Sequence, residues 1–307
     1  MNYERAIIIK GKTRLEKLLD RYNSKSQAQF YINHNGGDFS EYESEHEQFY
    51  NGFNYAKKII NRQLKSTVLE RNFLPSFLFE KNDLIVVVGQ DGLVANTAKY
   101  VSTNPIFAIN PDLERNMGAL LPFDLNSLSE GYKRILRGQN ECKHITLAKA
   151  KMNDGQELLA FNDFYIGKSN HSSSRYKIIY QGRHENQSSS GIIISTGAGS
   201  TAWLSSVLNE FRGLEKFLGY KSTGTFQSME WDDDKLCYIV REPYKSPNFS
   251  TDMVAGYVNK DEKLIIESLM PDDGVIFSDG IMEDYLVFNS GRTVTITKAH
   301  DKAKLII

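Results

Sequence analysis

Residues 82–100 of the chain read NDLIVVVGQDGLVANTAKY. The apolar run 84–88 predicts a buried parallel strand, because helices cover both faces of such a strand. Gly89 and Gly92 let the backbone turn tightly and approach a ligand closely, since neither carries a Cβ. Residues 93–101 are compatible with a helix. The stretch therefore predicts a strand, a turn and a helix, an arrangement that favours a phosphate at the positive end of the helix.

Asp91 is the unusual residue of this turn, because a carboxylate repels phosphate oxygens. Its place makes chemical sense if it accepts a proton from an attacking hydroxyl or helps to hold Mg²⁺. A Gly-x-Asp-Gly sequence after a strand is more often only a turn, however. On this stretch alone both interpretations stay open.

The flanking segments of the N-terminal part alternate between strand and helix patterns. Short apolar runs at 6–9, 68–73 and 104–110 predict strands, and residues 12–22 and 45–64 carry apolar side chains at helical spacing. The polar, acidic segment 33–47 predicts a solvated loop. Alternation of this kind is typical of a doubly wound parallel sheet, which binds ligands at the carboxyl ends of its strands.

The C-terminal part has a different pattern. From residue 144 onward, short β-rich segments are separated by turn residues, with one helical break after Gly199. Such spacing favours an antiparallel sandwich. We therefore expect an α/β, Rossmann-like domain over residues 1–123 and a β-rich, antiparallel sandwich-like domain over residues 124–307.

Composition excludes several classes of partner. The formal net charge is -1 and 24% of the 307 residues are charged, so no general field attracts nucleic acid or an anionic membrane. Cys142 and Cys237 are too few for a disulfide framework. No apolar stretch approaches the roughly 20 residues that span a bilayer. The sequence predicts a cytoplasmic protein whose partners include neither nucleic acid nor membrane.

A second glycine-rich stretch follows the apolar run 192–195. Residues 195–203 read STGAGSTAW, in which small residues let a ligand lie against the backbone and Trp203 can stack on a base. The alternative is a connector in which Ser200 or Thr201 caps the next helix. The stretch by itself does not decide between them.

Four segments, in this order, resemble those of NAD kinases, and more closely those of the group that includes the mitochondrial NAD kinase. Residues 82–100 are similar to the family's strand, Gly-Gly-Asp-Gly turn and helix. Residues 104–120, NPIFAINPDLERNMGAL, resemble the strand and Asn-x-x-x-Glu-Arg-x-x-Gly-x-Leu extension that follow. Residues 160–178 resemble the segment with the family's Asn-Glu pair, and residues 189–204 its Thr-Gly-x-Gly-Ser turn. The similarity runs from about residue 12 to residue 297.

The resemblance implies an NAD kinase-like fold, with the site between an α/β and a β-rich domain. It implies transfer of the terminal phosphate of ATP to the 2′-hydroxyl of the adenosine ribose of NAD, giving NADP. Mg²⁺ would bridge phosphate oxygens. Members of the family are homodimers or larger homo-oligomers, so we expect a homo-oligomer here.

The resemblance also assigns roles to residues of this chain. Asp91 would accept the proton of the ribose hydroxyl, Gly89, Gln90 and Gly92 would bind ATP phosphates, and Arg115 is a further phosphate partner. Asn162 and Asp163 occupy the Asn-Glu position and would bind ribose hydroxyls. The other residues predicted to bind NAD are Asn110, Arg175, Thr196, Gly199, Ser200, Thr201, Ala202 and Trp203.

The chain departs from the family pattern at three positions. Gln90 stands where the family has glycine, Leu93 where it usually has threonine, and Asp163 is one methylene shorter than glutamate. The Gln90 side chain could narrow the phosphate channel or donate its amide to a phosphate oxygen. Two alternatives therefore stay open: a catalytically weak or inactive nucleotide-binding protein, or a kinase of another small-molecule acceptor such as a lipid or sugar.

Overall fold

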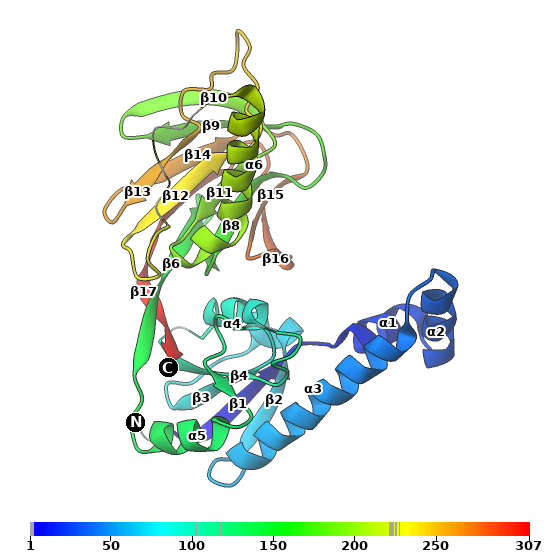
Figure 1. Ribbon diagram of the computed structural model, residues 1–307. Coiled ribbons are helices and arrows are strands. Elements are labelled where there is room, and N and C mark those ends of the chain that lie inside the picture. The colour runs from blue at the N-terminus through cyan, green and yellow to red at the C-terminus, as the bar shows by residue number, and fades with distance from the viewer. Residues whose placement is uncertain (1–2, 102, 117, 221–223, 225, 227) are drawn as a thin grey trace. The chain divides into compact units, whose positions relative to one another are not determined.

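The computed structural model describes residues 3–101, 103–116, 118–220, 224, 226 and 228–307. The chain forms two compact units, Met1–Lys143 with Lys304–Ile307, and His144–Ala303 (Figure 1). The division lies at 143/144 and not at the predicted 123/124. The reason is that α5 (Leu128–Leu136) places Leu128, Tyr132 and Ile135 in the hydrophobic core of the first unit.

The first unit contains a parallel sheet in the order β2–β1–β3–β4. Its strands are β1 (Arg5–Lys10), β2 (Ser66–Glu70), β3 (Asp83–Val88) and β4 (Pro105–Asn110). All residues of β3 and β4 are buried, as their unbroken apolar sequences predict. Two further segments pair parallel with β4: β5 (Phe123–Asp124) and the end of β17 (Thr293–Ile306). The predicted parallel α/β architecture is confirmed.

Helices flank the strands of this sheet. α4 (Asp91–Ala98) follows β3, the short 3-10 helix η1 (Arg71–Ser76) follows β2, and α5 follows β5. The long helix α3 (Phe39–Ile60) packs Phe53, Ala56 and Ile60 against the same core as α5. This core stabilises the strands that carry the predicted phosphate turn.

α1, α2 and the N-terminal part of α3 together form a helical arm. α1 (Arg14–Tyr22) and α2 (Lys25–His34) gather around the start of α3, with Leu15, Ala28 and Phe39 in a small core of their own (Figure 1). The prediction of a loop over 33–47 is therefore wrong. The Asp38 side chain accepts the Ser40 N–H and caps α3, and Phe39 is buried among the acidic residues. These two residues supply the start signal that the polar composition concealed.

The second unit is an antiparallel sandwich. One sheet has six strands in the order β13–β12–β11–β8–β15–β16. Its strands are β8 (Asp163–Lys168), β11 (Ile192–Ser195), β12 (Lys235–Val240), β13 (Ala255–Asn259), β15 (Gly274–Ser278) and β16 (Ile281–Val287). The facing sheet consists of β6 (Cys142–Met152), β7 (Glu157–Ala160), β9 (Ser174–Tyr180), β10 (Arg183–Ser189), β14 (Leu264–Ser268) and β17. The predicted sandwich is confirmed.

The core of the sandwich lies between these sheets. Phe164, Ile192 and Ile194 of the first sheet share a buried cluster with Tyr176 and Ile266 of the second.

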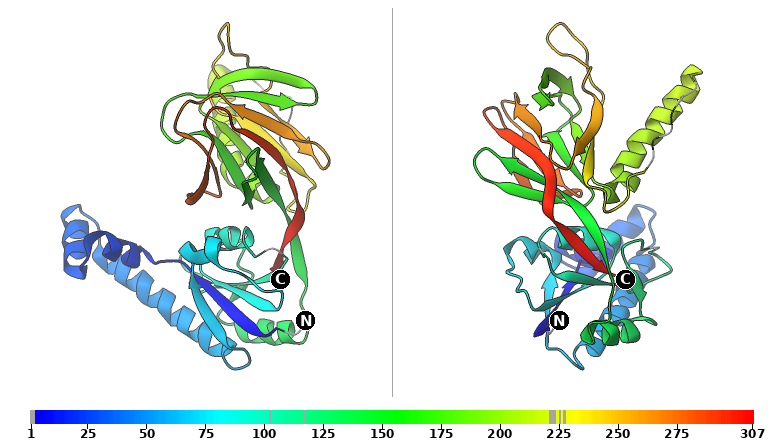
Figure 2. Two further views of the ribbon diagram at one scale, coloured as in Figure 1. Left: turned by 180° about the vertical axis from the view of Figure 1, so that it is seen from behind. Right: turned by 90° about the vertical axis from the view of Figure 1, so that its left-hand side faces the viewer.

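On the outer face of the first sheet, α6 (Trp203–Leu218) packs Leu204 against Cys237. Figure 2 shows α6 along one side of the second unit. Side chains of β12 thus alternate between the sandwich core and α6, as the strand pleat requires.

A glycine in α3 tests the packing of that helix. A Cβ at Gly52 would lie 2.9 Å from Pro111 Cβ and 3.1 Å from the Pro111 carbonyl oxygen. Alanine normally stabilises a helix interior by about 1 kcal/mol over glycine. We expect Gly52→Ala to lower Tm in calorimetry, because the clash with backbone outweighs this gain.

The matched control is Gly213→Ala in α6, where no atom lies within 4 Å of the added Cβ. This variant should raise Tm, because only the helix propensity changes. An equal increase in Tm in both variants would contradict the packing of α3 on Pro111.

Candidate functional site

The turn between β3 and α4 has an extended backbone. Gln90 is exposed, with φ -118° and ψ 163°, and its side chain makes no capping hydrogen bond. A Cβ at Gly89 would lie 3.0 Å from Leu93 Cδ2, whereas a Cβ at Gly92 would meet nothing within 4 Å. Open space therefore surrounds the first turn of α4 at Gly92. Leu93 is buried and packs on Gly89, so its side chain belongs to the core.

The Asp91 carboxylate ties this turn to the loop after β4. Its two oxygens accept the backbone N–H groups of Ala119 and Leu120, each at 2.9 Å. Gly118 of this loop has a φ of +59°, and a Cβ there would lie 3.0 Å from Asn110 Nδ2. Asp91 thus has a fixed orientation at the first residue of α4, and each oxygen keeps a lone pair for a second donor.

Asn110 and Arg115 organise the same loop. Asn110 is buried at the end of β4, where its side chain donates to the Asn116 carbonyl at 2.9 Å and accepts the Asp112 N–H at 3.0 Å. The Arg115 guanidinium donates to Asp112 at 2.9 Å and to Ser44 Oγ of α3 at 3.1 Å. Both predicted ligand-binding side chains therefore have partners within the first unit.

In the second unit, the turn before β8 lies against the turn after β11. Thr196 donates its N–H to the Asn162 carbonyl at 2.9 Å and its hydroxyl to the Phe161 carbonyl at 2.5 Å. A Cβ at Gly199 would lie 2.0 Å from the Asn162 carbonyl oxygen. A Cβ at Gly197 would lie 1.8 Å from the Glu230 carbonyl oxygen. These glycines are required by close contacts within the protein's own backbone.

The hydroxyls that follow do not cap α6. Ser200 Oγ donates to the Gly197 carbonyl at 2.7 Å and Thr201 Oγ1 to the Ala198 carbonyl at 3.4 Å, within the 3-10 turn η2 (Ala198–Thr201). Ala202 occupies the N-cap position, and no side chain caps the helix there. The predicted capping of α6 by Ser200 or Thr201 is therefore wrong.

Trp203, the first residue of α6, belongs to an aromatic cluster. Its ring stacks on Tyr165 at 5.9 Å and on Phe277 at 6.4 Å, with interplanar angles of 16°. The guanidinium carbon of Arg241 lies 5.5 Å from the Trp203 ring. The ring is half-buried, so one part of it faces the protein and another part is accessible.

Asp163 is a buried acid at the start of β8. Burial and the neighbouring Asp279 carboxylate raise its pKa to about 7, against the opposing effect of a hydrogen bond from the Trp203 N–H. Asp279 was not among the predicted site residues. Its carboxylate accepts the N–H groups of Phe161 at 3.0 Å, Asn162 at 2.6 Å and Asp163 at 3.3 Å. The sequence signal was the Asp-Gly pair of 277–280, which reads FSDG.

Arg175 does not join this group. It is exposed on β9 in the facing sheet, and its guanidinium carbon lies 5.9 Å from the Phe249 ring. Within the described ranges, no contact connects its side chain with the turns at Asn162 and Thr196.

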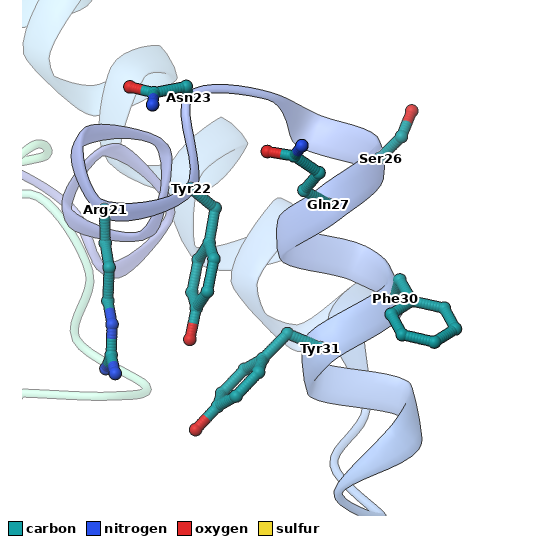
Figure 3. Close-up of a pocket in the computed structure, with 7 residues that line it drawn as sticks. All are labelled: Arg21, Tyr22, Asn23, Ser26, Gln27, Phe30 and Tyr31. Carbon is teal, nitrogen blue, oxygen red and sulfur yellow. The ribbon is translucent and has the colours of Figure 1, made fainter.

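A surface cavity of about 580 Å³ lies on the helical arm, and its lining includes no predicted site residue. Figure 3 shows its side chains on α1, α2 and the turn between them. They are Arg21, Tyr22, Asn23, Ser26, Gln27, Phe30 and Tyr31. It is an open groove, and nothing in it resembles the chemistry of the two turns.

In the described parts of the chain, no three or more His, Cys, Asp or Glu side chains are grouped so that they could hold a metal ion. No helix of these parts has the length and apolar character needed to cross a bilayer.

The chain was compared with known proteins. No protein-family model matches it. It is 30% identical over 128 residues to the NAD kinase of Clostridium kluyveri, which covers 39% of this chain and 44% of that protein. It is 28% identical over 137 residues to the NAD kinase of Paraburkholderia phymatum, which covers 42% of this chain and 45% of that protein. The matches thus span less than half the length of these relatives.

Two solved structures share the fold. The crystal structure of yeast NADH kinase complexed with NADH has a TM-score of 0.60 at 13% identity and covers 100% of this chain and 84% of that one. An NAD kinase from Archaeoglobus fulgidus in complex with ATP has a TM-score of 0.57 at 17% identity, with coverages of 98% and 92%. The comparisons do not single out the mitochondrial group. Its sequence matches and its fold are thus both similar to those of NAD kinases.

Proposed function

We propose that the chain is an NAD kinase-like phosphotransferase that moves the terminal phosphate of ATP to the 2′-hydroxyl of the adenosine ribose of NAD. The products are NADP and ADP. The observation that carries the proposal is the position of Asp91, at the first residue of α4 and at the carboxyl edge of a parallel sheet. Ligands of such sheets bind at this edge.

Asp91 acts in this proposal as the proton acceptor. The ribose oxygen attacks the terminal phosphorus, the bond from that phosphorus to ADP breaks, and the hydroxyl proton passes to an Asp91 oxygen. The hydrogen bonds from Ala119 and Leu120 hold the carboxylate in one orientation. Such pre-organisation matters because phosphoryl transfer depends mainly on positioning.

The phosphates of ATP would lie at the start of α4. Open space at Gly92 admits an oxygen close to the backbone, and the first N–H groups of a helix have no partner within the helix. Gln90 is exposed beside them and can donate its amide. Arg115 would support the loop of Asn110 through Asp112, since its guanidinium is already paired there.

The dinucleotide would bind through the second unit. Asn162 and Asp163 offer an amide and a carboxyl to ribose hydroxyls, and the Trp203 ring offers an apolar face to a base. In this proposal Thr196, Gly199, Ser200, Thr201 and Ala202 shape the turn that supports these groups. Arg175 lies on the facing sheet. In this proposal it would contact a phosphate only at a position away from the turns at Asn162 and Thr196.

Mg²⁺ is assigned no protein ligands. The described residues offer no three-residue cluster of His, Cys, Asp or Glu side chains for it. Mg²⁺ would enter bound to the phosphates of ATP, as is usual for this small hard cation. A cytoplasmic location and a homo-oligomeric state stay predictions.

The first prediction concerns Asp91→Asn. Because amide oxygen is a far weaker base than carboxylate, turnover should fall by about two orders of magnitude or more. NADP is measured by chromatography and transfer by labelled phosphate. The control is Asp124→Asn, since the Asp124 carboxylate also accepts two backbone N–H groups, from Asn126 at 3.0 Å and Ser127 at 2.7 Å. Full turnover of Asp91→Asn would remove Asp91 from the mechanism.

The second prediction distinguishes an active kinase from a weak nucleotide-binding relative. The Gln90 backbone is extended, so glycine is not required for its conformation. If Gln90 leaves the phosphate position accessible, Gln90→Gly should change turnover by less than about tenfold. A much larger gain would show that Gln90 blocks transfer and would favour the weak-kinase alternative. A screen of phosphate acceptors under the same conditions tests the third alternative.

The third prediction uses the raised pKa of Asp163. Between its usual value of 3.8 and about 7, the folded chain keeps a proton that the unfolded chain releases. Asp163 therefore makes a contribution to stability that falls as pH rises through this window and is constant above it. Asp163→Asn removes the titration, so Tm of the variant relative to wild type should increase from about pH 5 to about pH 8.

The control for this titration is Asp261→Asn, an exposed aspartate of the same unit. It should follow the wild-type pH profile of Tm. Parallel profiles for wild type and Asp163→Asn would show that Asp163 ionises in its ordinary range.

A further inference from the structure

The turn before β8 is held by a carboxylate from a distant part of the chain. Asp279 accepts three consecutive backbone N–H groups, those of Phe161, Asn162 and Asp163. Its own N–H donates to the Asp163 carbonyl at 3.0 Å. Hydrogen bonds to an ionised acceptor are stronger than neutral ones, and three from one turn fix its backbone in a single conformation.

The hairpin between β15 and β16 explains the backbone of Asp279 but not this contact. Asp279 and Gly280 both have positive φ, 54° and 70°, as a two-residue Asp-Gly turn requires. Asp273, which also precedes a glycine and has a φ of 55°, directs its carboxylate elsewhere, to Asn170 Nδ2 at 2.9 Å. An aspartate of positive φ before a glycine therefore does not by itself bring a carboxylate onto the 161–163 turn.

The contact also has an electrostatic cost. Two acids face each other here, because the Asp279 carboxylate opposes ionisation of Asp163 and raises its pKa. Closing the β15–β16 hairpin does not by itself require the Asp279 carboxylate to lie beside the Asp163 carboxyl. What the contact secures is the geometry of Asn162, whose half-buried side chain has no hydrogen-bond partner within the described residues.

On the opposite side, Thr196 completes the hold on the turn. Its hydroxyl donates to the carbonyls of Phe161 and Asn162 and its N–H donates to the Asn162 carbonyl, while Asp279 accepts the N–H groups of the turn. The backbone of 161–162 is thus bonded through both its donors and its acceptors. The half-buried Asn162 side chain is left as the part that a ligand can meet.

We propose that Asp279 is a positioning residue for dinucleotide binding: its carboxylate holds the 161–163 backbone so that the Asn162 amide and the Asp163 carboxyl meet the ribose hydroxyls in a fixed geometry. This inference rests on the proposed function. It adds a residue that acts through others and that contacts neither ATP nor the reacting atoms.

The test compares Asp279→Asn with the matched control Asp273→Asn. In Asp279→Asn one acceptor oxygen becomes an amide donor facing N–H groups, so the turn loses part of its hold. We expect KM and Kd for NAD to rise about tenfold or more, while KM for ATP and kcat change much less. Asp273→Asn should leave all four quantities close to wild type. A fall in Tm without a change in NAD affinity would make Asp279 a structural residue only and overturn the inference.

Amide hydrogen exchange on the wild-type chain tests the same point without a variant. If Asp279 pre-organises the turn, the N–H groups of residues 161–163 should exchange slowly in the free protein and change little when NAD is added. Fast exchange that slows only with NAD would show that the ligand orders the turn, against the inference. Calorimetry of wild type with NAD, together with NADP formation, decides the proposed function separately.

Discussion

The Asp91 carboxylate joins two loops at the carboxyl edge of the parallel sheet. Asp91 accepts the N–H groups of Ala119 and Leu120, so the turn after β3 and the loop after β4 form one connected structure. Without this contact the loop would be joined to the turn mainly through the β3–β4 pairing and the Gly89 N–H bond to the Ile109 carbonyl. The chemistry proposed for Asp91 and the shape of its surroundings therefore depend on the same two oxygens.

The second unit uses the same device with a different acid. Asp279 holds the 161–163 turn by three N–H groups, and Thr196 holds it by its carbonyls. In both units a buried or half-buried carboxylate orders a loop that carries polar groups. Loops lack the repeated backbone hydrogen bonds of helices and sheets, so their N–H groups need other acceptors, and the two carboxylates provide them.

Glycine has a different role at the two glycine-rich stretches. At Gly92 the missing Cβ leaves open space, which suits the approach of a phosphate. At Gly197 and Gly199 the missing Cβ admits the carbonyls of Glu230 and Asn162, which belong to the protein itself. The same residue type in similar sequence contexts thus serves ligand access in one place and internal packing in the other, and only the contacts distinguish them.

The sequence by itself determined the two architectures, because they follow from local periodicity. Fully apolar runs became β3 and β4, and the short β-rich segments became a sandwich. Its resemblance to NAD kinases also singled out the Asp91 turn and the Asn162 and Thr196 turns as candidate binding segments, and this assignment stays a prediction. The sequence did not reveal α2 or the early start of α3, because the composition there is polar and the decisive residues are the Asp38 cap and buried Phe39.

Only the tertiary structure decided which side chains have partners. The pairing of Arg115 with Asp112 and Ser44, the separation of Arg175 from the Asn162 turn, and the hold of Asp279 on residues 161–163 all depend on contacts between distant segments. Asp279 and Asn162 are 117 residues apart in the chain. A local sequence pattern cannot predict a contact between residues so far apart in the chain. Such hydrogen bonds depend on how the sheets pack and not on the spacing of residues along the sequence.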